Sequence, residues 1–378
     1  MRCHRDLLCA GVHANQPSVP SAARAGRDRP GGLLASWGLV AVLAGCHRSP
    51  PPAPPPASGD AALQSALVLW DGDSHRDLRA VVVRRAGAIV AERYFDGETP
   101  GTLHDVRSAG KSVTALLVGI AIDRGKLEGT SATLAAVLPE ASTSAIADAG
   151  LDDLLTMRSG LDANDEDAAS PGNEDKLDAA ADPVGFALAV PAQARPGERY
   201  LYNSLTAYLV GLAVEHATGQ HLDELAGQAL FGPLGFTDWR WQRDGAGHTK
   251  GQGNLSLTAR DFSKLGQLVL DGGTYGGRRV ISERWIRDLA QPRVSIGDVD
   301  PYADGYGYFW YTKTHRIGDR EVVVWFASGN GGNKIYVVPS YGVVVAITSS
   351  AYNHGYGQRR SQAILQTVLA ALEPLPPG

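Results

Sequence analysis

Segments typical of β-strands lie at both ends of this chain, and segments typical of helices lie between them. Residues 78–97 form two β-branched runs around Ala86 and Gly87, which predicts a hairpin. Turn residues separate four further strand-like runs, at residues 305–315, 320–327, 333–339 and 342–350. Alternating aromatic residues in the first two of these runs are expected on the sheet faces: Tyr306, Tyr308, Trp310 and Trp325.

The middle of the chain has apolar residues at helical spacing. Helices are expected at residues 104–125, 151–157, 204–218, 222–230, 258–270 and 281–289, and a last one at 358–372. This order predicts an α/β fold of the α+β type. One antiparallel sheet would be built from both chain ends and flanked by helices, with a helical lobe inserted between them. Because such a sheet joins the two ends, we expect a single compact domain.

The N-terminal 45 residues have the pattern of a signal peptide, with a basic flank and a short apolar run at Leu33–Ala44. The four residues Leu43–Cys46, at the end of this run, resemble a bacterial lipobox, whose cysteine is acylated. A plain signal peptide is the alternative. Residues 46–60 are a proline-rich linker. We therefore expect an exported lipoprotein, anchored to the membrane at Cys46 and facing the periplasm or cell exterior, whose domain spans residues 61–378.

Composition excludes several kinds of function. The three cysteines are Cys3, Cys9 and Cys46, so the predicted domain has no disulfide framework and no cysteine nucleophile. A net charge of −5 gives no basic surface for nucleic acid. The oligomeric state stays open.

Three groups of charged or titratable residues stay ambiguous at this stage. Residues 162–182 hold eight acidic residues and one lysine. This segment is either a solvated loop or the border of a cleft. His216 and His221 lack a third metal ligand, so surface histidines are the simpler interpretation. His354 either lies in a loop or reaches the mouth of a cleft.

Ser108 and Lys111 stand three residues apart at the start of the helix expected within residues 104–125. Residues at this spacing share a helix face, so the lysine can reach the serine. The free N–H groups and the dipole at a helix start favour developing negative charge. Serine needs an adjacent base to act as a nucleophile. The pair is either such a nucleophile with its base or an ordinary surface pair.

Four motifs in order resemble the serine β-lactamase-like hydrolases, which include class C β-lactamases, D-alanyl-D-alanine carboxypeptidases, related esterases and 6-aminohexanoate-dimer hydrolases. They are RSAGKSVTALLVGIAIDRGKL, LDDLLTMRSGLD, PGERYLYNSLTAYLVGLAVEHATG and WFASGNGGNKIYVVP. The resemblance implies a β-lactamase/transpeptidase-like fold and acyl-enzyme chemistry without cofactor or metal. It also implies that Ser108 is the nucleophile, Lys111 its base, and Tyr202 the relay of a proton to the leaving group. Ser204 stands where the family has asparagine, so its contact with Lys111 is uncertain.

The family's Lys-Thr-Gly motif is replaced in this chain. Residues 313–315 read Lys-Thr-His but lie one strand too early, whereas Ala327, Ser328 and Gly329 precede two further glycines. The resemblance then implies that Ser328 and Gly329 contact substrate. It also implies an oxyanion hole made by the N–H groups of Ser108 and Asn330.

Ala327 cannot supply the cation that attracts a carboxylate in β-lactamases and carboxypeptidases. Acidic residues near the cleft would repel anions further. We therefore expect a serine hydrolase acting on a small ester or amide that is neutral or cationic. The alternatives are a β-lactamase or D-alanyl-D-alanine carboxypeptidase, and, in another class, a catalytically idle cell-wall-binding lipoprotein.

Overall fold

The computed structural model describes residues 61–373. The predictions for the signal peptide, for Cys46 and for the proline-rich linker lie outside these residues. Within the described part of the chain, no helix is long and apolar enough to cross a membrane.

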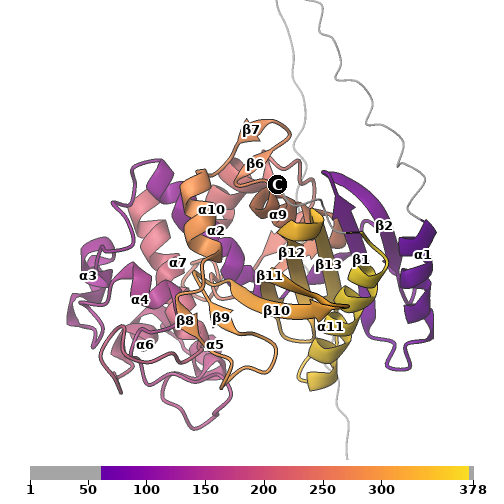
Figure 1. Cartoon of the computed structure of the whole chain (residues 1–378). Coiled ribbons are helices and arrows are strands. Elements are labelled where there is room, and N and C mark those ends of the chain that lie inside the picture. Colours follow the sequence, from indigo (N-terminus) through magenta and orange to yellow (C-terminus); the bar gives the residue numbers. More distant parts are fainter. Residues whose placement is uncertain (1–60, 374–378) are drawn as a thin grey trace, which may run out of the picture. The chain divides into compact units, whose positions relative to one another are not determined.

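An eight-stranded sheet joins the two ends of the chain, in the order β2-β1-β13-β12-β11-β10-β9-β8 (Figure 1). Strand β1 (Leu78–Arg85) pairs antiparallel with the last strand, β13 (Val343–Ser349), and with β2 (Ala88–Tyr94). The predicted hairpin and the sheet built from both chain ends are therefore confirmed. The buried, mostly valine residues of β1 and β13 explain why each of these strands lies inside the sheet with a neighbour on both sides.

The neighbouring strands form the other half of the sheet: β12 (Asn333–Val338), β11 (Arg320–Gly329), β10 (Tyr311–Ile317), β9 (Gly305–Tyr306) and β8 (Val294–Ser295). Pairing between β10 and β11 ends at Tyr311 and Phe326. The last three residues of β11, at 327–329, pair only with β12. Their other edge carries backbone groups without a strand partner, and such an edge can pair with an extended ligand.

The expectation of one strand over residues 305–315 is wrong. Residues 307–310 form a turn between β9 and β10, and Phe309 in this turn has a φ of 54°. The turn packs against the helix that follows Ser108, because the Ser112 hydroxyl donates to the Phe309 carbonyl at 2.6 Å. Tyr308 and Trp310 are therefore buried side chains of this turn and do not alternate on a strand.

Helices cover both faces of the sheet (Figure 1). Helix α9 (Ala259–Leu270) packs on β1, β12 and β13. Its Gly266 faces Ile335 and Val344 so closely that an added Cβ would lie 2.5 Å from a methyl of each. Helices α1 (Ala61–Val68) and α11 (Gly355–Ala370) pack together on the other side, so the last helix covers the sheet as expected.

The remaining elements lie between β2 and β8 along the chain and form the inserted lobe. Helix α2 (Ala109–Asp123) packs against α7 (Ser204–Thr218), and nearly every residue of both is buried. The shorter helices are α3 (Leu134–Val137), α4 (Leu151–Leu155), α5 (Glu174–Ala179), α6 (Pro183–Ala189), α8 (Leu222–Ala226) and α10 (Glu283–Ala290). A small sheet joins β3 (Leu103–Asp105), β5 (Leu255–Thr258) and β4 (Trp239–Trp241), and β6 (Thr274–Tyr275) pairs with β7 (Arg278–Arg279).

The close approach of α9 to the sheet predicts the effect of Gly266→Ala. Overpacking a filled core costs about 1–3 kcal/mol, whereas alanine improves helix propensity by about 1 kcal/mol at most. We expect a lower free energy of unfolding, measured by urea denaturation. The control is Gly72→Ala, because no atom lies within 4 Å of the added Cβ there. Equal stability of both variants would contradict the tight packing.

Candidate active site

A strained turn places Ser108 at the start of α2. Arg107, the residue before it, has a φ of 53°, a conformation that is uncommon for residues other than glycine. The Arg107 N–H donates to the Asp105 carboxylate at 2.8 Å, and its guanidinium lies 4.5 Å from the centre of the Tyr352 ring. These contacts hold a backbone conformation that directs the chain sharply from β3 into the helix.

The Lys111 amine joins three segments of the chain. Its Nζ donates to the Ser108 hydroxyl at 3.0 Å, to the Ser204 hydroxyl at 3.0 Å and to the Gln252 carbonyl at 2.9 Å. The side chain is only 1% exposed. All three donors of the ammonium group are therefore satisfied without water, and the serine that replaces the family's asparagine does reach Lys111.

Two carboxylates from the acidic segment lie on the far side of Ser204. The Ser204 hydroxyl is 2.8 Å from one carboxylate oxygen of Asp165 and 2.8 Å from one of Glu174. The Ser204 N–H donates to the other oxygen of Asp165 at 3.1 Å. A hydroxyl has one proton to donate, so it cannot satisfy both carboxylates. The acidic segment therefore borders the site.

The charges of this cluster shift the proton affinities of its members. Burial alone would lower the pKa of Lys111, but Tyr202, Asp165 and Glu174 outweigh it, and the net pKa is raised. Burial raises the pKa of Asp165, and the nearby Glu174 acts in the same direction against Lys111. In the resting site Lys111 is therefore an ammonium ion, and Asp165 accepts a proton more readily than an ordinary aspartate.

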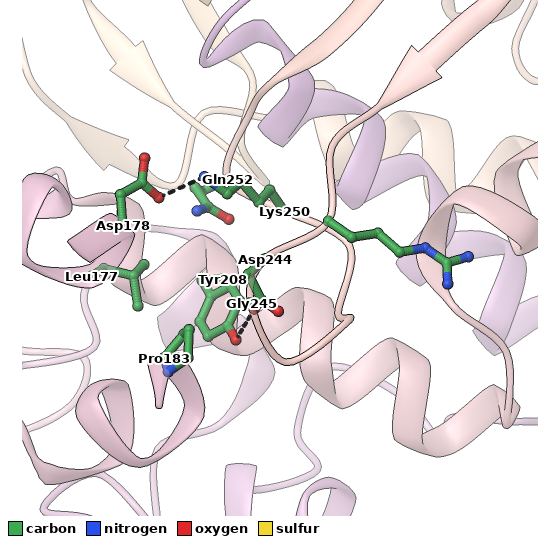
Figure 2. Close-up of a pocket in the computed structure, with 9 residues that line it drawn as sticks. Leu177, Asp178, Pro183, Tyr208, Asp244, Gly245, Lys250 and Gln252 are labelled. Atoms are coloured by element: carbon green, nitrogen blue, oxygen red, sulfur yellow. Dashed lines mark hydrogen bonds and ion pairs between the residues drawn. The ribbon is translucent and has the colours of Figure 1, made fainter. Parts of the chain in front are cut away.

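Hydrogen bonds and an ion pair hold the acidic segment in place. The Asn173 side-chain amide donates to the backbone carbonyls of residues 164, 165 and 167. Lys250 forms an ion pair with Asp178 at 2.9 Å, which Figure 2 shows across a cavity of about 130 Å³ beside the site. In the same view the Tyr208 hydroxyl donates to Asp244. The segment is ordered by specific contacts, which a freely solvated loop would lack.

The loop that carries Gln252 fits against α2 through glycines. An added Cβ on Gly110 would lie 3.1 Å from the Cα of Gly253, and one on Gly253 would lie 3.2 Å from the Arg107 carbonyl. Gln252 was not identified from the sequence, because its contribution to the site is a backbone carbonyl. The run Gly-Gln-Gly at residues 251–253 is the sequence signal for this close approach.

Tyr202 lies beside the amine of Lys111. Its ring centre is 5.0 Å from Lys111 Nζ. The segment before α7 fixes its position, because the Leu201 N–H donates to the Met157 carbonyl at 2.8 Å and the Asn203 side chain caps α7. Met157 has a φ of 56°, a second non-glycine residue in the left-handed region next to the site. The structure therefore brings together Ser108, Lys111, Tyr202 and Ser204.

The end of β11 lies against the start of α2. An added Cβ on Gly329 would collide with the Val106 carbonyl, so only glycine fits there. In residues 61–373, neither the N–H of Ser108 nor that of Asn330 donates a hydrogen bond to another protein group. The Asn330 side chain is held by a pair of hydrogen bonds to Asn353, each 2.7 Å. Two unpaired backbone donors next to a serine hydroxyl suit the oxygen of a tetrahedral intermediate.

A second buried lysine lies on the strand next to Ser328. Lys334 of β12 stands opposite Ser328 of β11, and its Nζ donates to the Ser328 hydroxyl at 2.7 Å. Lys334 was not identified from the sequence, because the family resemblance directs attention to position 327 of β11, which holds alanine, whereas Lys334 lies on β12. The signal that could have found it is the cross-strand register of two antiparallel strands.

Within residues 61–373, the other sequence candidates form no hydrogen bond or ion pair with Ser108, Lys111 or Tyr202, although His354 directly follows Asn353, which bonds to Asn330. Lys313 forms an ion pair with Asp304 at 2.7 Å, and His354 is exposed and stacks on Tyr356. His221 lies near Glu215 and His248, three groups spaced closely enough to ligate a metal. Glu215 already accepts from His248 at 2.7 Å and from two backbone N–H groups, so hydrogen bonds account for this arrangement.

Comparison with known proteins agrees with this architecture. A family model described as Beta-lactamase matches residues 74–369. The 6-aminohexanoate-dimer hydrolase of Paenarthrobacter ureafaciens is 26% identical over an alignment of 294 residues, and the match covers 74% of this chain and 74% of that protein.

Two solved structures share the fold. A family VIII carboxylesterase has a TM-score of 0.65 at 16% identity, and the match covers 82% of this chain and 98% of the esterase chain. The octameric penicillin-binding protein homologue from Pyrococcus abyssi has a TM-score of 0.62 at 18% identity, and the match covers 81% of this chain and 77% of the homologue's chain. The expected β-lactamase/transpeptidase-like fold is confirmed, and the chain belongs to the β-lactamase family of serine hydrolases.

Proposed function

We propose that the protein is an esterase or amidase that forms an acyl-enzyme on Ser108. The observation that carries this proposal is the Ser108 hydroxyl, which lies 3.0 Å from the buried Lys111 amine at a helix start that has free N–H groups. The relatives support it, since one is named a 6-aminohexanoate-dimer hydrolase and another a carboxylesterase.

In the proposed reaction, Ser108 Oγ attacks the substrate carbonyl carbon and its proton passes to Lys111. The carbonyl oxygen becomes an oxyanion, which the N–H groups of Ser108 and Asn330 stabilise. The bond to the leaving group then breaks, and Tyr202 relays a proton to the departing oxygen or nitrogen. Water releases the acyl group in a second attack through the same steps.

Lys111 must lose a proton before it can act as a base, because its raised pKa keeps it charged at rest. A connected route leads from Lys111 through the Ser204 hydroxyl to Asp165, over distances of 3.0 and 2.8 Å. In this route Ser204 gives its proton to Asp165 and receives one from Lys111. The raised pKa of Asp165 makes it a suitable acceptor.

The preference for a neutral or cationic substrate remains a proposal. Asp165 and Glu174 support it at their end of the site, where they would attract a positive group and repel an anion. Ala327 supports it as well, because an alanine supplies no cation at the position where β-lactamases and carboxypeptidases attract a carboxylate.

The first test is Ser108→Ala, assayed with a fluorophosphonate probe and with p-nitrophenyl acetate. Loss of the nucleophile should abolish labelling and reduce kcat/KM by roughly 10⁴-fold. Ser112→Ala is the matched control, because Ser112 lies on the same helix but its hydroxyl is buried and bonded to the Phe309 carbonyl. If the Ser108 variant is labelled as well as the wild type, the protein is not a serine hydrolase of this kind. A catalytically idle protein would leave both labelling and hydrolysis undetected.

The second test is Asp165→Asn, assayed through the pH dependence of kcat/KM. Asp165 raises the pKa of Lys111, so its neutralisation should lower that pKa. The neutral amine would then exist at lower pH, and the acid limb of the profile should shift toward lower pH. The plateau should also fall, because the proposed proton acceptor is lost.

Asp175→Asn makes the same chemical change in the acidic segment at an exposed position of α5. It should leave the acid limb where it is in the wild type. Equal shifts in both variants would indicate a general effect of net charge and would contradict a specific route through Asp165.

We also propose export of the protein and acylation of Cys46, on the basis of the Leu43–Cys46 motif and the proline-rich residues that follow. Cells that produce the full chain should incorporate labelled palmitate into it, and the protein should fractionate with membranes. Cys46→Ser should abolish both results. Palmitate labelling that persists in this variant would contradict the proposal.

A further inference from the structure

A carboxylate and two imidazoles converge at the end of α7 that lies away from Ser204. Glu215 stands in the last turn of this helix, His221 directly precedes α8, and His248 lies in the loop between β4 and β5. Their ligand atoms all lie within 4.8 Å of one another. The sequence pattern showed His216 and His221 without a third metal ligand. The fold supplies Glu215 and His248 as partners of His221.

Backbone contacts orient the Glu215 carboxylate toward the two rings. Its oxygen Oε1 accepts from the Leu222 N–H at 2.9 Å and from the Thr249 N–H at 3.0 Å. Each of these residues directly follows one of the two histidines. The carboxylate therefore fixes both histidine segments through Oε1, and its other oxygen, Oε2, faces the imidazoles. Hydrogen bonds of this kind hold the ligands of metal sites in position.

The distances around Oε2 suit a shared metal ion. The Nδ1 atom of His248 lies 2.7 Å from Oε2, and that of His221 lies 3.4 Å from it. An N–H···O hydrogen bond usually spans about 2.7–3.2 Å, so the His221 contact is long for one. Two ligands on a tetrahedral zinc ion lie about 3.4 Å apart, because each bond is about 2.0–2.2 Å. Opening the His248 contact by less than about 1 Å admits such an ion.

Burial and charge also favour a cation at this place. The Glu215 side chain is 7% exposed, whereas the two imidazoles are 37% and 35% exposed, so water reaches the site from the imidazole side. Asp223 and Glu224 add negative charge at the start of α8, and Arg243 pairs with both. Three carboxylates around one guanidinium leave an excess of negative charge, which attracts a cation.

We propose that Glu215, His221 and His248 bind one Zn²⁺ ion, with water as the fourth ligand. Two imidazole nitrogens and one carboxylate oxygen are donors that zinc prefers, whereas Mg²⁺ and Ca²⁺ prefer oxygen ligands alone. Hydrogen bonds account for the arrangement without an ion. When zinc binds, each ring coordinates through Nδ1 and carries its proton on Nε2, so both imidazoles stay neutral.

The ion has a structural role in this proposal and takes no part in the proposed reaction. The loop of His248 continues to Gln252, whose carbonyl accepts from Lys111 at 2.9 Å. Helix α7 begins at Ser204, whose hydroxyl accepts from the same amine at 3.0 Å. An ion that joins the end of α7 to this loop therefore ties together two segments that position Lys111. The zinc site does not depend on the proposed function, because it is tested by ion binding and by unfolding.

The experiment measures Zn²⁺ binding to the full chain by isothermal titration calorimetry, after removal of metal with EDTA. Cys3, Cys9 and Cys46 are first alkylated, because free thiols also bind zinc. We expect one ion per chain. With Zn²⁺ in about hundredfold excess over its Kd, the Tm should rise by about 5 °C. The same concentration of Mg²⁺ should leave the Tm unchanged.

His221→Ala and His248→Ala should each weaken zinc binding by at least about a hundredfold, since even partners outside the ligand shell contribute about ten- to hundredfold. The rise of Tm with zinc should disappear in both variants. His216→Ala is the matched control, because it removes an exposed histidine of the same helix end, which lies near Glu140. It should bind zinc as the wild type does. If one ligand variant does not fold, as judged by circular dichroism, the other makes the same comparison.

Two results would overturn the zinc site. One is a wild-type chain that shows no zinc binding at micromolar concentrations. The other is zinc binding by His221→Ala and His248→Ala that is as tight as binding by His216→Ala. Either result would leave Glu215 as a hydrogen-bond acceptor that holds the two histidine segments together.

Discussion

The buried amine of Lys111 is the interaction on which the rest of the site depends. It ties the helix of Ser108 to the start of α7 through Ser204 and to the loop of Gln252. Each partner comes from a different part of the chain, so the amine fixes the relative position of three segments. Removing it would leave two hydroxyls and a carbonyl without their donor in a place that water hardly reaches. The strained backbone at Arg107, which is held by contacts with Asp105 and Tyr352, lies directly before the serine of this network.

Much of the architecture could be predicted from residue patterns. The helix caps of α7 and α9 follow from Asn203 and Thr258, whose side chains accept from the first turn of their helices. The pairing of β1 with β13 follows from two runs of buried valines that need a common sheet. The turn at residues 307–310 could not be predicted, because its aromatic residues have the spacing of a strand but pack against α2.

The candidate site was predictable where residues act through side chains at fixed spacing, as for Ser108 and Lys111. It was not predictable where tertiary contacts assemble it. Asp165 and Glu174 belong to a segment whose composition is typical of a solvated loop, and only the packing of that segment brings them to Ser204. Lys334 lies six residues after Ser328 in the chain, and the β11–β12 register converts that separation into a direct contact.

The pairing of β1 with β13 also determines when the site can exist during synthesis. Helix α2 is made early, whereas β11, β12 and β13 follow about 200 residues later. Until those strands emerge, Ser108 has no opposing Asn330 and β1 lacks one of its two neighbours. Contacts between such distant parts of a chain form late and slowly. The candidate site therefore cannot be assembled until nearly the whole domain has been made, and before that point the proposed nucleophile lacks the second proposed oxyanion donor.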